Sequence, residues 1–309
     1  MSELWDVYTI DRKLTGKTCI RGEQSKLLDD EFRIWVMVWI KNPKTGKYLV
    51  SQRTADKDVD PLKWETVAGH SISGETSLDA ALREVYEEVG IALKPENARI
   101  LATKVATTTD GERHNWIRDS FYFETTDEPD LNKATTKEVI QTKWLTFDEI
   151  REMYERGECC LNMGDIYGFE LNPVPQDGYR DIIGKVVKGK IDRPMGSYHP
   201  RHKNLYYPVN YGYVDGVIGG DGSEQDIYLL GETSAVTEFM GKVIAVYHRY
   251  DDDETKWIVV PCDEKGNVRS DIKIPSKDEI YAKIAFQEQF FSGVLVGNRE
   301  GRNTIWKQF

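Results

Sequence analysis

The sequence predicts an α+β protein of two domains, and three observations support this. The chain has 309 residues, which exceeds the usual length of one domain. In its first half, strand-like segments flank one helical segment, and more strands and a second helix follow. From Ile191 onward, short strand-like segments alternate with turn glycines and aromatic residues. We expect a first domain over 1–165, a linker over 166–188 and a second domain over 189–309.

The first elements follow from hydrophobic patterning. Residues 4–20 mix alternating apolar positions with turn residues and predict a short hairpin, turning at Asp11-Arg12 or at Thr15-Gly16. The run FRIWVMVWI at 32–40 predicts a buried strand, and 48–52 predicts its partner. Later strands and an exit helix are expected at 64–67, 98–107, 116–126, 139–145 and from Phe147 onward.

The segment GHSISGETSLDAALREVYEEVGI, residues 69–91, predicts a loop followed by an amphipathic helix. Its apolar residues recur at helical spacing, so one face packs inward. The opposite side places Glu84, Glu87 and Glu88 at i, i+3 and i+4, with Arg83 four residues before Glu87. Like charges at this spacing repel one another. We therefore expect a cation among these carboxylates.

With Glu75 in the entry loop, the same segment matches GX5EX7REVXEEXGI at every defining position. It resembles the signature of the Nudix hydrolases, and this match is highly specific. The resemblance implies an α/β/α sandwich whose loop–helix–loop binds divalent metal and cleaves diphosphate bonds in nucleoside diphosphates linked to another moiety. Together with WDVY, the strand at 32–40 and Trp64-Glu65-Thr66, it is similar to the branch that resembles isopentenyl diphosphate isomerase, over roughly residues 3–155.

Hydrolysis is favoured over isomerisation. The isomerases need a reactive cysteine shortly after the early strands and have a degenerate motif. Here no cysteine lies between Cys19 and Cys159, and the motif is complete. The four cysteines show no metal-binding spacing, so we expect free thiols at Cys19, Cys159, Cys160 and Cys262.

The resemblance implies a site in the first domain. Glu84, Glu87, Glu88 and Glu138 are expected to bind Mg²⁺ or Mn²⁺ ions that bridge a substrate diphosphate. Glu84 or Glu138 would deprotonate the attacking water, and Arg83 would orient the acidic cluster by pairing with it. Specificity lies in loops outside the motif, where the candidates for substrate contact are Lys63, Trp64, Arg113 and Trp116.

The second domain contains YPVNYGY at 207–213, Gly-Asp-Gly from Gly220, and Asp226. Downstream, HRYDDDETKWIVVP at 248–261 adds an acidic loop and a lysine. Over about residues 189–295 this resembles the soluble inorganic pyrophosphatases and implies a small OB-like β-barrel.

Chemistry supports a second phosphoanhydride site. Cleavage requires neutralising the charge on phosphate oxygens and lowering the pKa of a water, and carboxylates that hold Mg²⁺ achieve both. The acidic candidates are Asp221, Asp226, Asp252, Asp253 and Glu254, and the basic ones are Arg193, Arg201, Lys203 and Lys256. The resemblance assigns Asp221, Asp226 and Glu254 to metal, and Tyr211 and Lys256 to phosphate. Asp252 is a further metal candidate, and Arg201 and Lys203 are further substrate contacts.

Two departures leave an alternative open. The pyrophosphatase triplet D-G-D-x-x-D has Ser223 at its middle position, so one metal ligand is missing unless Glu224 or Asp215 replaces it. Phe290 and Phe291 stand where that family usually has a tyrosine–lysine pair. The second domain is therefore either an inorganic diphosphatase or a degenerate phosphate-binding or regulatory module.

Composition limits the partners. The net charge of −11 argues against nonspecific binding to nucleic acid or anionic membranes. The N-terminus lacks an apolar leader, and no stretch approaches eighteen apolar residues, so we expect a cytoplasmic protein. The expected partner is a small-molecule diphosphate or nucleotide. A homodimer is compatible with the family, since Nudix domains often dimerise.

Overall fold

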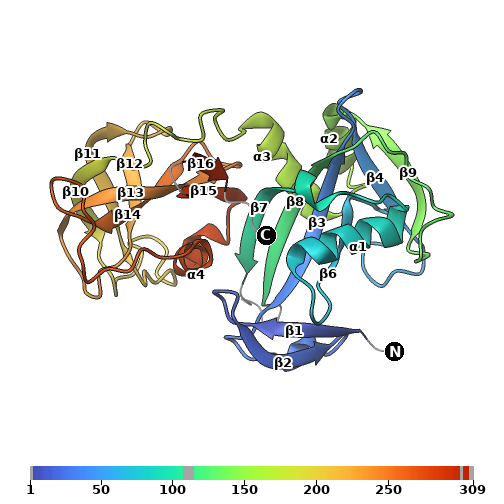
Figure 1. The fold of residues 1–309 in the computed structure, drawn as a ribbon, viewed down its shortest axis with the longest axis horizontal. Helices are drawn as coiled ribbons and strands as arrows, with labels where there is room; N and C mark the ends of the chain where they lie inside the picture. Colours follow the sequence, from blue (N-terminus) through green and yellow to red (C-terminus); the bar gives the residue numbers. More distant parts are fainter. Residues whose placement is uncertain (1–2, 107–114, 300–301, 306–309) are drawn as a thin grey trace. The chain divides into compact units, whose positions relative to one another are not determined.

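The computed structural model describes residues 3–106, 115–299 and 302–305. Arg113, one candidate for substrate contact, lies outside these residues. The chain forms two compact units, Met1–Glu170 and Leu171–Gln308, which are coloured from blue to green and from yellow to red in Figure 1. In the described chain, no helix is both long enough and apolar enough to cross a membrane.

The first unit is built on a mixed seven-stranded sheet with the main order β5-β4-β3-β8-β7, in which β6 pairs with β3 and β9 with β4. The long neighbours β3 and β8 run parallel, and a separate two-stranded sheet, β1-β2, precedes them. The strands are β1 Leu4–Tyr8, β2 Leu14–Ile20, β3 Arg33–Lys41, β4 Tyr48–Arg53, β5 Trp64–Glu65, β6 Val67–His70, β7 Arg99–Ala106, β8 Trp116–Glu124 and β9 Val139–Leu145. The helices are α1 Ser77–Val89, α2 Phe147–Glu155 and α3 Asp165–Leu171, with 3₁₀ turns η1 Gln24–Lys26, η2 Pro95–Asn97 and η3 Leu161–Gly164.

Helix α1 is the element that the acidic motif predicts, and its ends explain its length. Thr76 caps the N-terminus in a capping box with Asp79. The helix stops at Gly90, which adopts the left-handed conformation with φ 71°. A Cβ at Gly90 would also lie 2.2 Å from the carbonyl oxygen of Asp130. Both facts require glycine there.

The second unit contains a seven-stranded sheet with the order β10-β11-β12-β14-β13-β15-β16. Strand β10 pairs with both β11 and β13, so the pairings among five of the strands return to their starting point. The elements are β10 Val186–Arg193, β11 Asn210–Ile218, β12 Glu224–Leu229, β13 Glu238–Arg249, β14 Thr255–Pro261, α4 Lys277–Glu288, β15 Gly293–Arg299 and β16 Arg302–Ile305. Its core combines aliphatic residues with buried tyrosines, among them Tyr207, Tyr211, Tyr228, Tyr247 and Tyr281.

The first residues of the second unit are attached to β13 through His248. The hydroxyl of Tyr179 donates to Nδ1 of the buried His248 at 2.6 Å, and Nε2 donates to the carbonyl oxygen of Asn172 at 2.6 Å. Asn172 also donates to the carbonyl oxygens of Arg249 and Asp252, both at 3.1 Å. Burial lowers the pKa of His248 below its ordinary value, and the hydrogen bond to Asn172 offsets only part of this shift. The neutral imidazole therefore accepts one hydrogen bond and donates another, and so links Tyr179 to Asn172.

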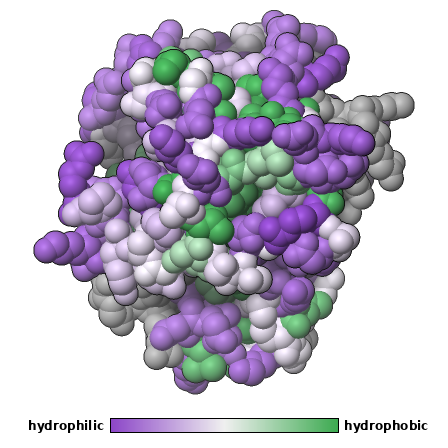
Figure 2. All heavy atoms as spheres, turned by 90° about the vertical axis from the view of Figure 1, so that its left-hand side faces the viewer, coloured by the Kyte–Doolittle hydropathy of each residue, from purple (hydrophilic) through white to green (hydrophobic). Residues whose placement is uncertain are grey.

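Most elements lie where hydrophobic patterning predicts them, with ends shifted by one or two residues. The early hairpin turns at Asp11-Arg12, since β1 ends at Tyr8 and β2 begins at Leu14. Within the range expected to be a linker, 166–188, the structure contains most of α3 and the start of β10. The four cysteines are buried free thiols. On the face seen in Figure 2, hydrophilic residues predominate around smaller apolar areas.

Candidate active site

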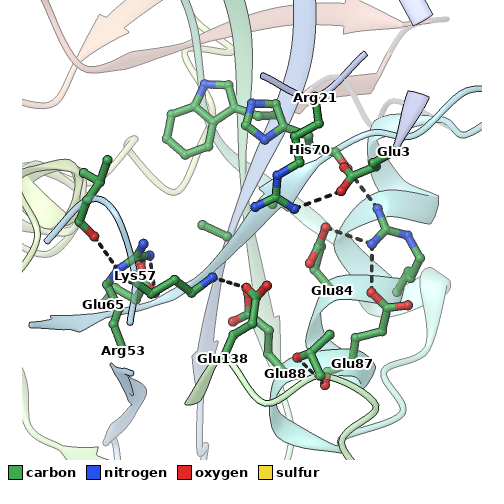
Figure 3. Close-up of a pocket in the computed structure, with 16 residues that line it drawn as sticks. Glu3, Arg21, Arg53, Lys57, Glu65, His70, Glu84, Glu87, Glu88 and Glu138 are labelled. Carbon is green, nitrogen blue, oxygen red and sulfur yellow. Dashed lines mark hydrogen bonds and ion pairs between the residues drawn. The ribbon is translucent and has the colours of Figure 1, made fainter. Parts of the chain in front are cut away.

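A cavity of about 400 Å³ opens in the first unit beside the acidic side of α1 (Figure 3). Its volume lies within the usual range for small-molecule sites. Most of its lining residues are charged: Glu3, Arg21, Trp35, Arg53, Lys57, Val59, Glu65, Ala68, Gly69, His70, Arg83, Glu84, Glu87, Glu88, Thr136 and Glu138. The cavity therefore collects all five catalytic or metal-binding residues expected in this domain.

Arg83 organises the acidic side of the cavity. Its Nη1 contacts Glu84 Oε1 at 2.8 Å and Glu87 Oε2 at 3.0 Å. Its Nε and Nη2 bind both carboxylate oxygens of Glu75, at 2.7 and 3.0 Å. Nη2 also donates to the carbonyl oxygen of His70 at 2.8 Å. One guanidinium thus joins the entry loop, the helix and the end of β6.

Glu88 is the most constrained carboxylate of the cavity. It is only 5% exposed, and within the described residues its Oε2 has no hydrogen-bond partner. Burial raises the pKa of Glu88 well above its usual value, and the nearby carboxylates Glu65, Glu84 and Glu138 raise it further. A buried, unpaired carboxylate oxygen is costly unless a cation compensates it.

Gly69 makes room for Glu84. A Cβ at this position would lie 2.0 Å from both Cδ and Oε1 of Glu84. The first glycine of the motif is therefore required by the close approach of a carboxylate. Burial raises the pKa of Glu84 to about 7, while the charge of Arg83 opposes that rise. A group with this pKa is suited to accepting a proton near neutral pH.

The opposite side of the cavity is basic, and patterning alone did not identify it. Arg53, the last residue of β4, binds both oxygens of Glu65 at 2.7 and 2.8 Å. Lys57 forms an ion pair with Glu138. The signal for these residues is their place at the end of β4 and in the loop that follows it. Of the candidates proposed for substrate contact, Lys63, Trp64 and Trp116 are not among the lining residues.

The β1–β2 hairpin supplies one wall of the cavity. It brings in Glu3 and Arg21, which form an ion pair at 2.9 Å. Arg12, which lies in the turn of this hairpin, forms a bidentate salt bridge with the fully buried Asp119 on β8, at 2.6 and 2.8 Å. This contact fastens the hairpin to the sheet.

The donor set of the cavity fits a hard divalent cation, because its carboxylate oxygens are the ligands that Mg²⁺ and Mn²⁺ prefer. The orphaned Oε2 of Glu88 is the specific sign of this fit. Among the residues that the structure describes, no three aspartate, glutamate, histidine or cysteine side chains lie close enough together to hold a metal ion. Arg83 lies between Glu84 and Glu87, and Lys57 holds Glu138, so these carboxylates are paired with cationic side chains.

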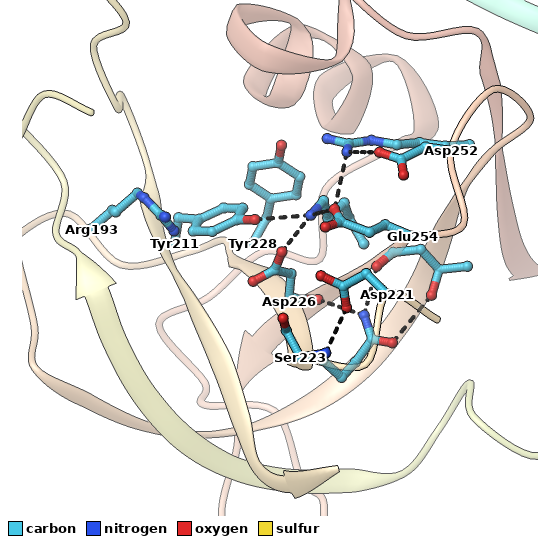
Figure 4. Close-up of polar contacts among 12 residues, drawn as sticks. Arg193, Tyr211, Asp221, Ser223, Asp226, Tyr228, Asp252 and Glu254 are labelled. Carbon is cyan, nitrogen blue, oxygen red and sulfur yellow. Dashed lines mark hydrogen bonds and ion pairs between the residues drawn. The ribbon is translucent and has the colours of Figure 1, made fainter. Parts of the chain in front are cut away.

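A second polar cluster lies in the second unit (Figure 4). The buried Lys256 forms ion pairs with Asp226 and Glu254 and donates to the hydroxyl of Tyr211 at 3.0 Å. The buried Arg249 contacts Asp252 at 2.9 Å and Glu254 at 3.2 Å. The structure thus brings these predicted residues together, and Arg249 is a member that the sequence analysis did not single out.

The remaining predicted residues of this cluster differ in placement. Asp221 accepts a hydrogen bond from the backbone of Ser223 at 2.9 Å, and this bond lowers the pKa of Asp221. Arg201 and Lys203 are exposed, and among the described residues no hydrogen bond or ion pair joins either side chain to the cluster. Arg193, also a sequence candidate, lies 5.0 Å from the ring centre of Tyr211 instead. Phe291 packs on the guanidinium of Arg249 at 3.5 Å.

Comparison with known proteins places this geometry in a family. The profile described as NUDIX domain matches residues 31–159. An uncharacterized Nudix hydrolase of Listeria innocua is 35% identical over 159 residues, which are 50% of this chain and 87% of the relative. Another, from Listeria monocytogenes, is 44% identical over 98 residues, or 31% of this chain and 56% of the relative. An isopentenyl-diphosphate Δ-isomerase of Cutibacterium acnes is 39% identical over 57 residues, or 18% of this chain and 29% of the relative.

Proposed function

This chain belongs to the Nudix hydrolases, and we propose that its first domain hydrolyses a diphosphate linkage in a nucleoside diphosphate derivative or a nucleoside triphosphate. The observation that supports this most directly is the buried, orphaned carboxylate of Glu88 among Glu65, Glu84 and Glu138. Such a cluster suits a cation-assisted reaction on an anionic substrate. A cavity of about 400 Å³ has a size suited to a small-molecule substrate.

In the proposed reaction, Glu84, Glu87, Glu88 and Glu138 would hold Mg²⁺ or Mn²⁺, which would neutralise charge on the diphosphate. Glu84 accepts a proton from the attacking water, with Glu138 as the alternative base. A bond forms between the water oxygen and phosphorus, and the bond to the bridging oxygen breaks, leaving its electrons on the departing phosphate. Arg83 positions Glu84 and Glu87, while Arg53 and Lys57, which also line the cavity, would contact phosphate oxygens after leaving Glu65 and Glu138.

Substitution of Glu87 tests this proposal. Glu87→Gln removes one charge and keeps the side-chain shape, so we expect loss of Mg²⁺-dependent cleavage across a panel of nucleoside diphosphate derivatives and triphosphates. Glu152→Gln on α2 is the matched control, because Glu152 lies outside the cavity lining and should leave activity unchanged. Full activity of the Glu87 variant would contradict the assigned role.

We further propose that the second domain, over 189–309, is a small OB-like β-barrel that hydrolyses inorganic pyrophosphate. The pairing of β10 with both β11 and β13 supports a closed barrel. The meeting of Asp226 and Glu254 at Lys256, with Tyr211 beside it, supports a phosphate site. Asp221 and Asp252 would complete the metal ligands. The alternative is a non-catalytic phosphate-binding or regulatory domain, which Ser223 and Phe291 favour.

The two proposed activities would be coupled if the first domain cleaves a nucleoside triphosphate to the monophosphate. That reaction releases pyrophosphate, and its removal by the second domain would pull the first reaction forward. A dinucleotide or sugar-nucleotide substrate would release none.

Two variants distinguish a second domain that hydrolyses pyrophosphate from a non-catalytic one. Mg²⁺-dependent phosphate release from pyrophosphate and cleavage of a nucleotide panel are both measured for the wild type, Asp226→Asn and Glu87→Gln. Independent sites predict that each substitution abolishes one activity and preserves the other. Asp181→Asn, an exposed residue of the same unit, is the control for Asp226. Absence of pyrophosphate turnover in the wild type would leave the regulatory alternative.

A further inference from the structure

Four cationic side chains line the cavity of the first unit, and each is paired with at least one carboxylate. The pairs are Arg21 with Glu3, Arg53 with Glu65, Lys57 with Glu138, and Arg83 with Glu84 and Glu87. Two of these cations, Lys57 and Arg83, are paired with expected metal ligands. A divalent cation would therefore compete with these two side chains for the same carboxylate oxygens.

Lys57 and Arg83 differ in how firmly they are held. Arg83 also binds both carboxylate oxygens of Glu75 and donates to the carbonyl oxygen of His70, so its position does not depend on the metal ligands alone. The ammonium group of Lys57 has a single hydrogen-bonding and ion-pairing partner among the described residues, which is Glu138. Lys57 is therefore the easier of the two cations to displace.

Lys57 lies on the loop that joins β4 to β5, residues 54–63, and its side chain turns inward from this loop. The neighbouring Asp56 and Asp58 are exposed, whereas the side chain of Lys57 is only 18% exposed and lines the cavity (Figure 3). Ordering a long lysine side chain costs conformational entropy. The contact with Glu138 offsets this cost and keeps the ammonium group in the cavity.

The base of the same loop is attached to Glu138 independently of the ammonium group. The backbone amide of Thr54 donates to the carbonyl oxygen of Glu138 at 3.1 Å. The four-carbon stem of a lysine is flexible, so the ammonium group of Lys57 can leave the carboxylate while this backbone bond persists. Displacement of Lys57 is therefore a local event that does not require the loop to unfold.

The charge of Lys57 also reaches a second expected metal ligand. Burial raises the pKa of Glu88, and the charge of Lys57 opposes that rise. The ammonium group thus compensates the charge of Glu138 by direct contact and that of Glu88 through its field. These are two of the carboxylates that the metal ion is expected to bind.

We propose that Lys57 is an internal counter-ion, which occupies Glu138 in the metal-free protein and is exchanged for the divalent cation when metal binds. The inference rests on the proposed hydrolysis, because that proposal assigns Glu138 to the metal. Lys57 weakens metal binding by competing for Glu138. Metal binding in turn frees the ammonium group of Lys57 for a phosphate oxygen of the substrate.

Lysine labelling of the wild type measures this exchange directly. The metal-free protein and the protein with saturating Mg²⁺ are treated briefly with acetic anhydride, and modification of each lysine is quantified by mass spectrometry. The paired Lys57 should react slowly without metal, and Mg²⁺ should raise its rate of modification several-fold. The exposed Lys137, adjacent to Glu138 in sequence but outside the cavity lining, should react at the same rate in both states. An unchanged rate for Lys57 in protein that binds Mg²⁺ would overturn the inference.

The affinity for Mn²⁺, measured by calorimetry, reports the competition. The site in the first unit is identified as the one that Glu87→Gln weakens or removes. Lys57→Met keeps the length of the side chain and removes its charge, so the Kd of this site should fall about 2- to 10-fold. Lys57→Arg keeps the charge, so its Kd should not fall. Lys137→Met is the matched control: it removes a charge beside Glu138 without removing the ion pair, and should change the Kd less than about 2-fold.

A double variant separates competition for Glu138 from a general effect of charge. Adding Lys57→Met to Glu138→Gln should leave the Kd unchanged, because the contested carboxylate is absent. Equal tightening in both backgrounds, or by Lys57→Met and Lys137→Met alike, would overturn the inference. If Lys57→Met does not fold, the labelling of the wild type decides the question.

The same measurements distinguish the inference from the proposed function. Exchange at Lys57 on binding of Mg²⁺, without cleavage of any diphosphate, would support the inference and refute the proposed function. Mg²⁺-dependent cleavage with no change in the labelling of Lys57 would refute the inference and leave the proposed function intact.

Discussion

Replacing Gly69 by alanine should inactivate the first domain without unfolding it. The new Cβ would lie 2.0 Å from Cδ of Glu84, whereas ordinary contacts begin at 3.4 Å, so the carboxyl group must move by about 1.4 Å (3.4 − 2.0). The obstacle is the end of a flexible side chain, which can swing away. The fold should therefore persist while the proposed base and metal ligand is displaced.

The expected loss follows from that displacement. Misplacing a catalytic group by about 1 Å can reduce a rate about 100-fold, which corresponds to about 2.7 kcal/mol of transition-state stabilisation. We expect kcat/KM for Mg²⁺-dependent nucleotide cleavage to fall by this factor. The melting temperature of the metal-free protein should change little.

A double-mutant cycle shows whether the loss acts through Glu84. Glu84→Gln, Gly69→Ala and the double variant are assayed together with one substrate. If the alanine acts by displacing Glu84, adding it to Glu84→Gln should cost almost nothing further. Multiplying losses in the double variant, or a fully active Gly69→Ala enzyme, would refute the steric argument.

Three further predictions concern stability. Asp119→Asn leaves Arg12 without its buried counter-charge and should lower the free energy of unfolding by about 3–5 kcal/mol in urea titrations, whereas Glu23→Gln, at an exposed pair, should cost less than about 1 kcal/mol. Glu88→Gln removes a buried carboxyl group whose ionisation is opposed by burial, so calorimetry should show a higher melting temperature without metal and a smaller gain on adding Mg²⁺. The pKa of His248 is lowered in the folded state, so the unfolded chain binds more protons below pH ~6.5 and stability should fall as the pH drops from 7 to 5. His248→Asn should flatten that part of the pH dependence.

Each of these stability predictions has a clear opposing outcome. Equal effects of Asp119→Asn and Glu23→Gln would show that burial of the first pair contributes nothing. A lower melting temperature for metal-free Glu88→Gln would indicate that its carboxylate is already compensated. An unchanged slope between pH 5 and 7 in the His248 variant would assign the pH dependence to other groups.

The acidic half of the candidate site could be predicted from sequence because its residues are local. The Glu84–Glu88 spacing, the Thr76 cap and the stop at Gly90 all lie within one helix and its ends. Helical periodicity fixes which of these side chains share a face. Glu138 lies about fifty residues away, and only the family resemblance connected it to the cluster.

The other half depends on tertiary contacts that periodicity does not encode. Arg12 meets Asp119 across 107 positions of sequence, and this contact helps hold Arg21 beside the cavity. Periodicity did not predict helix α3, because Gly168 lies inside it and glycine has a low helix propensity. In the second unit, Arg201 belongs to a turn whose backbone bonds to His199, which leaves its side chain exposed.

The β1–β2 hairpin has a consequence for how the enzyme could change over time. It precedes the region that matches the NUDIX profile, yet it supplies Glu3 and Arg21 to the cavity. None of the expected metal ligands lies on it. Substitutions on this hairpin that keep the contact between Arg12 and Asp119 can therefore change the charges beside the cavity while the acidic helix remains intact. The fold thereby separates a variable border of the cavity from the acidic motif on α1.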